Sequence, residues 1–416
     1  MRTRGVGART PTAVWAVLAA GTVAHAVLVI TTVGVLYDLV VFTQTGHAFA
    51  DHGLAAYGHL PGGLRFGEVT IAHYPYPPLL LPWFAAANAI SDALGVAFPE
   101  VSKVLASFAD VVIAWLVQDL LGRRGASTSA RAFAAGLVAL GPCFLATSAY
   151  HGQVDAAAIL PAVAALWLWE RGRHRATAWW SGALVGAGAA MKTFPGLLAL
   201  PLIAAARSRR EAVRVAIAAV AVPVLITLPF AVATPGAVAK ALSYKGLPGQ
   251  GGISLLAQPA LADSWLHTRG LALNGIERAL YGGGATALTT LGVVALVAFL
   301  AYTRPPAVTG AVLLWLTLYV CGVNFFLQYL VWGIPFFLMA GHLRAVAALQ
   351  VAAVPALVLI YGVPWQNDAV GVVYAAILIG MWLAFAVALF AVARNCLRIS
   401  PSRATQWRTR SAASAR

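Results

Sequence analysis

Long apolar runs separated by short polar stretches dominate the chain. A helix needs roughly 20 apolar residues to cross a lipid bilayer, and it satisfies its own backbone hydrogen bonds there. The pattern therefore predicts an all-α, polytopic integral membrane protein with about 12 transmembrane helices (range about 11 to 13). The predicted spans lie near residues 12–36, 101–121, 132–149, 154–169, 176–191, 194–206, 212–233, 285–303, 307–323, 326–341, 345–363 and 369–392.

One further apolar run, 77–92, is predicted to lie along the membrane surface. It opens with two prolines and contains Asn88, Ser91 and Asp92. If it does not cross, every arginine cluster falls on one side, as the positive-inside rule expects for cytoplasmic loops. Both termini are then cytoplasmic. All but seven of the 28 Lys and Arg residues lie on that side; the seven are Arg65, Lys103, Lys192, Lys240, Lys245, Arg269 and Arg278.

The composition excludes several classes of protein. With 61% hydrophobic and 10% charged residues, a chain of 416 residues cannot cover itself with polar surface as a soluble globule. The net charge of +15 comes mostly from the predicted cytoplasmic arginines, so it does not indicate a nucleic-acid binder. Three cysteines form no disulfide framework. The first run imitates a signal peptide but is long enough to span, and we expect it to be retained.

Loop lengths indicate the face on which the protein works. The predicted outer loops are much longer than the cytoplasmic ones, and ten of the 13 Asp and Glu residues lie outside or within the membrane. We therefore expect the chemistry on the outer face. The predicted organisation is a tail 1–11, a seven-helix module 12–233 containing outer loop 37–100, a second outer loop 234–284, helices 285–392 and a basic cytoplasmic tail 393–416.

Several short motifs follow one another along the predicted outer face. They are Asp38 directly after the first span, His73-Tyr74-Pro75-Tyr76-Pro77-Pro78-Leu79, His151-Gly152-Gln153-Val154-Asp155, Lys192-Thr193-Phe194-Pro195 and Gln328-Tyr329-Leu330-Val331-Trp332-Gly333-Ile334-Pro335. In order and placement they resemble the GT-C-fold glycosyltransferases that use polyprenol-phosphate sugars. The resemblance is strongest to the actinobacterial α-mannosyltransferases of phosphatidylinositol mannoside synthesis, and it extends to the catalytic subunit of GPI mannosyltransferase I.

The resemblance implies a GT-C fold with interfacial helices in the first outer loop. It also implies transfer of a hexose, with mannose expected, from a polyprenyl-phosphate sugar to a glycolipid or polysaccharide acceptor. The transfer would invert the anomeric carbon and take place on the outer face of a bacterial plasma membrane. Where the relatives have Pro-Gln-Tyr, this chain has Leu327-Gln328-Tyr329, which leaves the role of that element open.

Asp38 is the candidate general base. Transfer from a phosphate leaving group needs one base for the acceptor hydroxyl and no acid, whereas a glycosidase needs a carboxylate pair. The family places its catalytic aspartate in this loop, and Asp38 matches by position. The alternative is that Asp38 caps the following helix. Asp51 is the reserve, with a solvated loop position as its alternative.

Basic and polar residues at the outer ends of helices are the candidate ligands. The candidate ligands of the donor phosphate are Lys192, Arg269 and Lys245. Their alternative roles are snorkelling of the side chain to the membrane interface or solvation of a loop. The candidate ligands of the sugar or acceptor are His151, Gln153, Asp155, Tyr74, Tyr76, Gln328, Tyr329 and Asp51. Their alternative roles are hydrogen bonding at helix ends and packing at the membrane interface. His151, Gln153 and Asp155 have the alternative role of positioning Asp38 through hydrogen bonds.

No cofactor is expected. Walker and dinucleotide glycine signatures are absent from the sequence, and the loop histidines match no zinc spacing, so a divalent metal is not indicated. Asp110, a charge inside the second span, marks either a functional site or a bond between helices. The expected partners are the lipid-linked donor, the acceptor and membrane lipids, and not nucleic acid. A transporter or lipid flippase, or a non-catalytic subunit of cell-envelope polysaccharide assembly, stays open as the alternative.

Overall fold

Helices follow the predicted apolar runs along the whole computed structural model. The structure describes residues 10–62, 64–66, 69–71, 73–172, 175–243, 275, 279–322, 327–362 and 368–413. Within these, the helices at the predicted spans are α1 (Thr12–Thr31), α4 (Phe98–Arg123), α5 (Thr128–Ala139) with α6 (Pro142–Phe144) and η3 (Leu145–His151), α7 (Asp155–Arg171), α8 (Arg175–Met191), η4 (Phe194–Leu198) with α9 (Ala199–Ala204), α10 (Arg209–Ala233), α15 (Ala285–Thr303), α16 (Ala307–Cys321), η6 (Leu327–Tyr329) with α17 (Leu330–Met339), α18 (Leu343–Gly362) and α19 (Asp368–Ala413).

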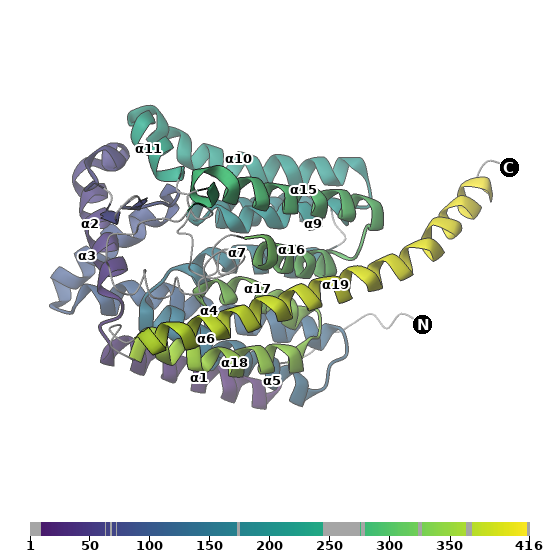
Figure 1. Ribbon diagram of the computed structural model, residues 1–416, viewed down its shortest axis with the longest axis horizontal. Helices are drawn as coiled ribbons and strands as arrows, with labels where there is room; N and C mark the ends of the chain where they lie inside the picture. The colour runs from purple at the N-terminus through teal and green to yellow at the C-terminus, as the bar shows by residue number, and fades with distance from the viewer. Residues whose placement is uncertain are drawn as a thin grey trace.

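The fold is that of an all-α integral membrane protein. Within the described residues, seven helices are long and apolar enough to cross a bilayer, and three shorter apolar helices accompany them. The predicted total of twelve spans therefore stays a prediction. The helices run side by side as a bundle, and α19 continues beyond it (Figure 1). The described strands form one short antiparallel hairpin, β1 (Leu64–Phe66) and β2 (Val69–Ile71), in the first long loop.

Local sequence signals explain several helix boundaries. The Ser127 hydroxyl caps α5 by accepting a hydrogen bond from the Ala130 N–H at 3.2 Å, and Ser208 caps α10 in the same way. Small residues then set how closely helices pack. A Cβ on Gly182 of α8 would lie 2.6 Å from the Val215 carbonyl oxygen of α10, so glycine lets the two backbones touch.

The first long loop folds into a cap at one end of the bundle. It contains α2 (Leu36–His52), η1 (Gly53–His59), the hairpin, η2 (Pro78–Leu80) and α3 (Leu81–Leu94). Helices α2 and α3 pack together through stacked Phe42 and Phe84 rings, 4.5 Å apart. Helix α3, which contains most of the run 77–92, has only 14 residues and is not among the helices long enough to span. With α11 (Pro235–Leu242), these elements lie at the left of Figure 1.

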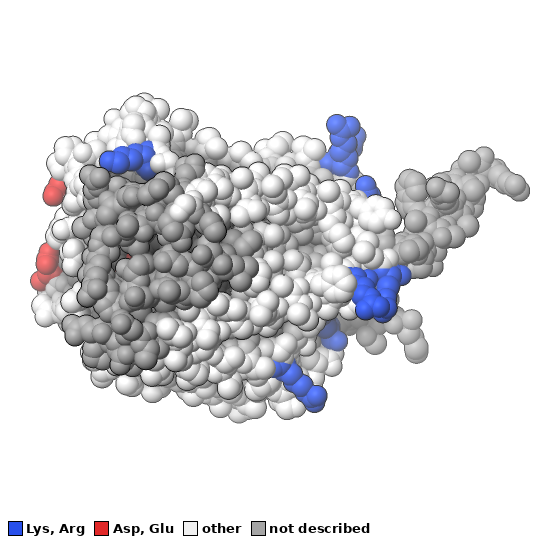
Figure 2. Space-filling model, in the orientation of Figure 1, with Lys and Arg blue, Asp and Glu red and all other residues white. Residues whose placement is uncertain are grey.

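Charge separates along the bundle. On the face shown in Figure 2, Lys and Arg side chains gather mostly at the end where α1 begins and α19 leaves the bundle, and the visible Asp and Glu side chains lie at the opposite end. We call the first the basic end and the second, which carries α2 and α3, the loop end. At the basic end, Arg123 pairs with Asp119 at 2.7 Å and Arg124 with Glu170 at 2.9 Å.

Candidate active site

A short extended linker at the loop end brings Asp38 to His151. Helix α1 ends at Thr31, and the Val35 N–H donates to the His151 carbonyl oxygen at 3.0 Å before α2 begins. Gly34 in this linker has φ +91°, and a Cβ there would lie 2.8 Å from the same oxygen. Only glycine combines that conformation with that approach without strain. The linker thus holds the start of α2 against the end of η3.

Asp38 and His151 form a hydrogen-bonded pair that continues to Tyr361. His151 Nε2 lies 2.7 Å from Asp38 Oδ2, and His151 Nδ1 lies 2.6 Å from the Tyr361 hydroxyl oxygen. An ionised carboxylate only accepts hydrogen bonds, so Nε2 carries the proton that Asp38 receives. Nδ1 accepts a hydrogen bond from Tyr361 when the ring is neutral and donates one when the ring is protonated. This chain fixes the carboxylate while its side chain stays 22% exposed, open to a reacting group.

The surroundings keep Asp38 ionised. Burial acts to raise the pKa of the Asp38 carboxyl, but the hydrogen bond and charge of His151, the Gln153 side chain and the Lys192 charge together lower it below its usual value. Asp38 is therefore a carboxylate at neutral pH. It is ready to accept a proton as soon as a bound hydroxyl becomes more acidic during bond formation.

A second, fully buried ion pair lies beside the first. Lys192, in the turn after α8, donates from Nζ to Asp155 Oδ1 at 2.8 Å, and the Gln153 side-chain oxygen is 3.5 Å away. Trp332 Nε1 donates to the same Asp155 oxygen at 2.6 Å. Asp155 is the first residue of α7, where a helix N-terminus favours negative charge. The charge of Lys192 is thus already balanced by a carboxylate.

Aromatic rings surround the ammonium group of Lys192. Its Nζ lies 4.5 Å from the centre of the Tyr76 ring and 5.9 Å from that of Trp332, both within cation–π range. Tyr329 stacks on Trp332 with ring centres 4.2 Å apart. Residues from the first loop, from the α8 turn and from η6–α17 therefore meet around one cation. Gln328 is half-buried in the same η6 turn.

Other predicted ligands lie elsewhere. Asp51 is exposed near the end of α2, thirteen residues and so about 20 Å along the helix from Asp38. Tyr74 is 1% exposed, and its hydroxyl donates to the Pro77 carbonyl oxygen at 3.4 Å, so it packs within the cap. Asp155, expected to bind sugar, is fully buried as the partner of Lys192. Arg269 and Lys245 lie outside the described residues.

Three residues of this region were not predicted from the sequence. Trp332 lies within the motif Gln328–Pro335 but has no local feature that marks it as a ligand, and Tyr361 carries no local signal. Lys103 was placed only as an outer charge. In the structure it is fully buried, and its ammonium donates to the Thr32 hydroxyl at 3.0 Å and to the Thr32 carbonyl oxygen. A lysine close to an apolar run could have indicated that its ammonium binds the free carbonyl groups at the end of a helix, here α1.

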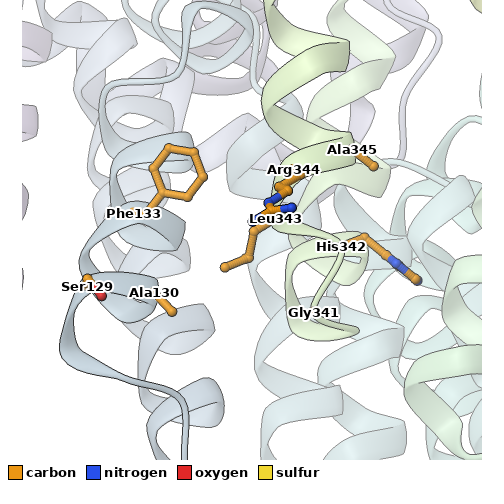
Figure 3. Close-up of a pocket in the computed structure, with 8 residues that line it drawn as sticks. All are labelled: Ser129, Ala130, Phe133, Gly341, His342, Leu343, Arg344 and Ala345. Atoms are coloured by element: carbon orange, nitrogen blue, oxygen red, sulfur yellow. The ribbon is translucent and has the colours of Figure 1, made fainter.

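A pocket of about 640 Å³ lies at the other end of the molecule. It opens at the basic end between the first turns of α5 and α18, and Phe133 and Leu343 point toward one another across it (Figure 3). Its lining residues are Ser129, Ala130, Phe133, Gly341, His342, Leu343, Arg344 and Ala345. None of these belongs to the pairs around Asp38 and Lys192, so the pocket is separate from the candidate active site.

Comparison with known proteins points to one family. The model of glycosyltransferase family 87 matches residues 74–327, more than half of the chain. No curated protein matches. Among solved structures, the chain is similar to the Archaeoglobus fulgidus oligosaccharyltransferase in the apo form, with 14% identity over 92% of this chain and 55% of that one and a TM-score of 0.43. The oligosaccharyltransferase AglB from the same organism, in complex with an inhibitory peptide and a dolichol-phosphate, gives 14% identity, the same coverage and 0.40. The chain thus spans about half the length of these archaeal chains.

Proposed function

The chain belongs to glycosyltransferase family 87, and from this membership we propose that its loop end transfers a sugar from a polyprenyl phosphate to an acceptor hydroxyl. The observation that carries the proposal is the convergence of an ionised, partly exposed Asp38 and a buried Lys192 at the end where α2 and α3 cap the bundle. A lipid-linked donor would present its head group at this depth, while its chain stays in the bilayer. The expected sugar is mannose, and the expected acceptor is a glycolipid or polysaccharide.

Asp38 acts as the general base in this proposal. Its carboxylate takes the proton of the acceptor hydroxyl while that oxygen forms a bond to the anomeric carbon. The bond from the anomeric carbon to the phosphate oxygen breaks on the opposite face, so the configuration is inverted. Polyprenyl phosphate leaves with the bonding electron pair and needs no protonation. His151 holds the carboxylate in place through its 2.7 Å hydrogen bond.

Lys192 contacts the donor phosphate. Its ammonium has three N–H groups, of which Asp155 and Gln153 occupy two. The remaining N–H is the one left for the phosphate, and the Tyr76 and Trp332 rings beside the ammonium suit the faces of a sugar. The Asp155 pair orients the ammonium, and the phosphate shares its charge. We place the basic end on the cytoplasmic side of a bacterial plasma membrane, because arginine-rich loops face the cytoplasm.

The test is sugar transfer by the purified chain. Labelled mannose, glucose and arabinose are supplied in turn as polyprenyl-phosphate donors with membrane lipid as acceptor. Asp38→Asn is expected to lower transfer by about 10²- to 10⁴-fold, the usual contribution of a general base. Asp51→Asn, on the same helix but exposed, is the matched control and is expected to keep wild-type activity.

Two outcomes would count against the proposal. Equal transfer by wild type and a correctly folded Asp38→Asn variant would remove Asp38 from the mechanism. Absence of transfer with every donor and acceptor would favour a flippase or a non-catalytic subunit over this reaction. Transfer of a sugar other than mannose would keep the reaction and correct the donor.

A further inference from the structure

A second His–Asp pair lies inside the bundle, away from the candidate active site. His25 of α1 and Asp110 of α4 are 2% and 0% exposed. His25 Nε2 and Asp110 Oδ2 are 3.8 Å apart, compared with 2.7 Å between His151 and Asp38. A separation of 3.8 Å is too long for a hydrogen bond. The two side chains therefore face each other without being bonded.

Hydroxyl groups adjoin the Asp110 carboxylate. Ser107 precedes it by three residues and so lies on the same face of α4. Ser148 of η3 faces it from the neighbouring segment. Both serines are at least nine-tenths buried. In the described part of the chain, neither Asp110 carboxylate oxygen, neither serine hydroxyl and neither His25 nitrogen makes a hydrogen bond of ordinary length and direction, although the Ser148 hydroxyl lies near Asp110 and the Ala139 backbone near His25.

So many unpartnered polar atoms in one place call for an occupant. Buried polar groups in proteins are almost always hydrogen-bonded, and the exceptions are commonly explained by a bound water or ion. Inside a bilayer the cost of leaving them unpaired is greater, because lipid offers no replacement partner. A proton on Asp110 would supply one hydrogen-bond donor, which is enough for only one of the neighbouring oxygens. A cation, in contrast, is coordinated by carboxylate and hydroxyl oxygens at the same time.

The charge and chemistry of the ligands select the class of cation. Asp110 and His25 are the titratable groups of the described residues shown to face this space. The nearest lysine on α4, Lys103, is seven residues and about 10 Å away and is bonded to Thr32 instead. One carboxylate balances one positive charge. Oxygen ligands favour hard ions, and the described residues contain no group of three His, Cys, Asp or Glu side chains of the kind transition metals use.

We propose that Asp110, Ser107 and Ser148 bind one Na⁺ ion between α1, α4 and η3, beside His25. The ion neutralises the carboxylate and satisfies the serine oxygens. Because η3 also ends at His151, the ion stabilises the segment that carries the partner of Asp38. The site lies within the helix bundle, and nothing in it depends on the sugar-transfer reaction.

The first test measures thermal unfolding of the purified full chain. NaCl replaces choline chloride stepwise at constant ionic strength, so that general salt effects cancel. Na⁺ is expected to raise the unfolding temperature saturably, by about 3 °C or more, since a ligand that binds only the folded state stabilises it. Asp110→Asn should abolish this response, and Ser107→Ala or Ser148→Ala should move it to higher Na⁺ concentration.

The matched control is Asp119→Asn, nine residues further along the same helix. Asp119 is paired with Arg123 and Trp167, so its variant should keep the wild-type response to Na⁺. Equal unfolding temperatures of the wild type in NaCl and choline chloride would overturn the proposal, as would an unchanged response in Asp110→Asn.

A second measurement does not depend on the stability of any variant. Wild-type protein equilibrated with radioactive sodium should retain about one ion per chain, displaced by unlabelled Na⁺ but not by choline. No retained sodium over the millimolar range would show that the cluster holds water or a proton instead, and the proposal would fail.

Discussion

Both ends of the helix bundle hold carboxylate–cation pairs, and the pairs differ in burial. At the loop end, the Lys192 and Asp155 side chains are 5% and 0% exposed. At the basic end, Arg124 and Glu170 are 37% and 23% exposed. The distances are nearly the same, 2.8 and 2.9 Å. Geometry alone therefore does not separate a structural ion pair from a functional one.

The environment separates them. An exposed ion pair contributes little stability because water screens its charges. Burying an ion pair has a large desolvation cost, which the attraction between the two charges only partly offsets. A chain gains little stability from burying Lys192 with Asp155. We infer that the pair is kept for what the ammonium does beside Asp38, while Arg124–Glu170 joins the ends of α4 and α7 at the basic end.

The largest effect is expected when one member of the buried pair is removed. Asp155→Ala leaves Lys192 as an unpaired charge among Trp332 and Tyr76, which should lower the free energy of unfolding by about 3–5 kcal/mol. Unfolding in detergent measures it. The double variant Asp155→Ala/Lys192→Met should recover much of the loss, and a single variant as stable as wild type would show that the pair is not buried as described.

A smaller effect is expected from the linker that holds the start of α2, with Asp38, against His151. Gly34→Ala strains a residue with φ +91° and brings its Cβ against the His151 carbonyl oxygen, so it should displace His151 and lower transfer at least about tenfold. The control is Gly53→Ala, which has φ +53° but no atom within 4 Å of the added Cβ. If both variants lose activity equally, backbone strain and not the close approach is responsible.

The pH dependence of transfer should sharpen the difference further. His151→Phe removes the hydrogen bond and charge that oppose the effect of burial, so the pKa of Asp38 should rise. Because the base must be ionised, activity should then be lost at a higher pH as the solution is acidified. The measurement is the acidic limb of the pH–rate profile. The control is Tyr361→Phe, which keeps the Asp38–His151 hydrogen bond and should leave the acidic limb much closer to that of the wild type. An unchanged acidic limb in His151→Phe would contradict the role of His151 in lowering the pKa of Asp38.

The smallest effect is expected at the basic end. Glu170→Gln removes an ion pair that is partly exposed, so stability should change by less than about 1 kcal/mol and transfer should stay at the wild-type rate. Unfolding and activity are measured on the same preparation. A loss comparable to that of Asp155→Ala would mean that burial does not distinguish the two ends.

Much of the architecture could be predicted from the chain alone. The apolar runs locate the helices, since a bilayer demands long apolar segments wherever the backbone crosses it. The polar residues and prolines of 77–92 agree with the shortness of α3, which has 14 residues, and the arginine clusters predicted the charge separation seen in Figure 2. These are local properties, each readable within one segment. Asp38 and Lys192 also stood out locally, as charges at the ends of apolar runs.

Only the tertiary structure decided which of these residues meet. His151 and Tyr361 are 210 positions apart, and Asp155 and Trp332 are 177 apart, so no spacing in the sequence links them. Packing made Asp155 the buried partner of Lys192, buried Tyr74 and brought the polar groups around Asp110 together. Hydrophobic pattern is set residue by residue along the chain. The partners of a charge depend on how helices distant in sequence pack, and that is determined by the whole fold.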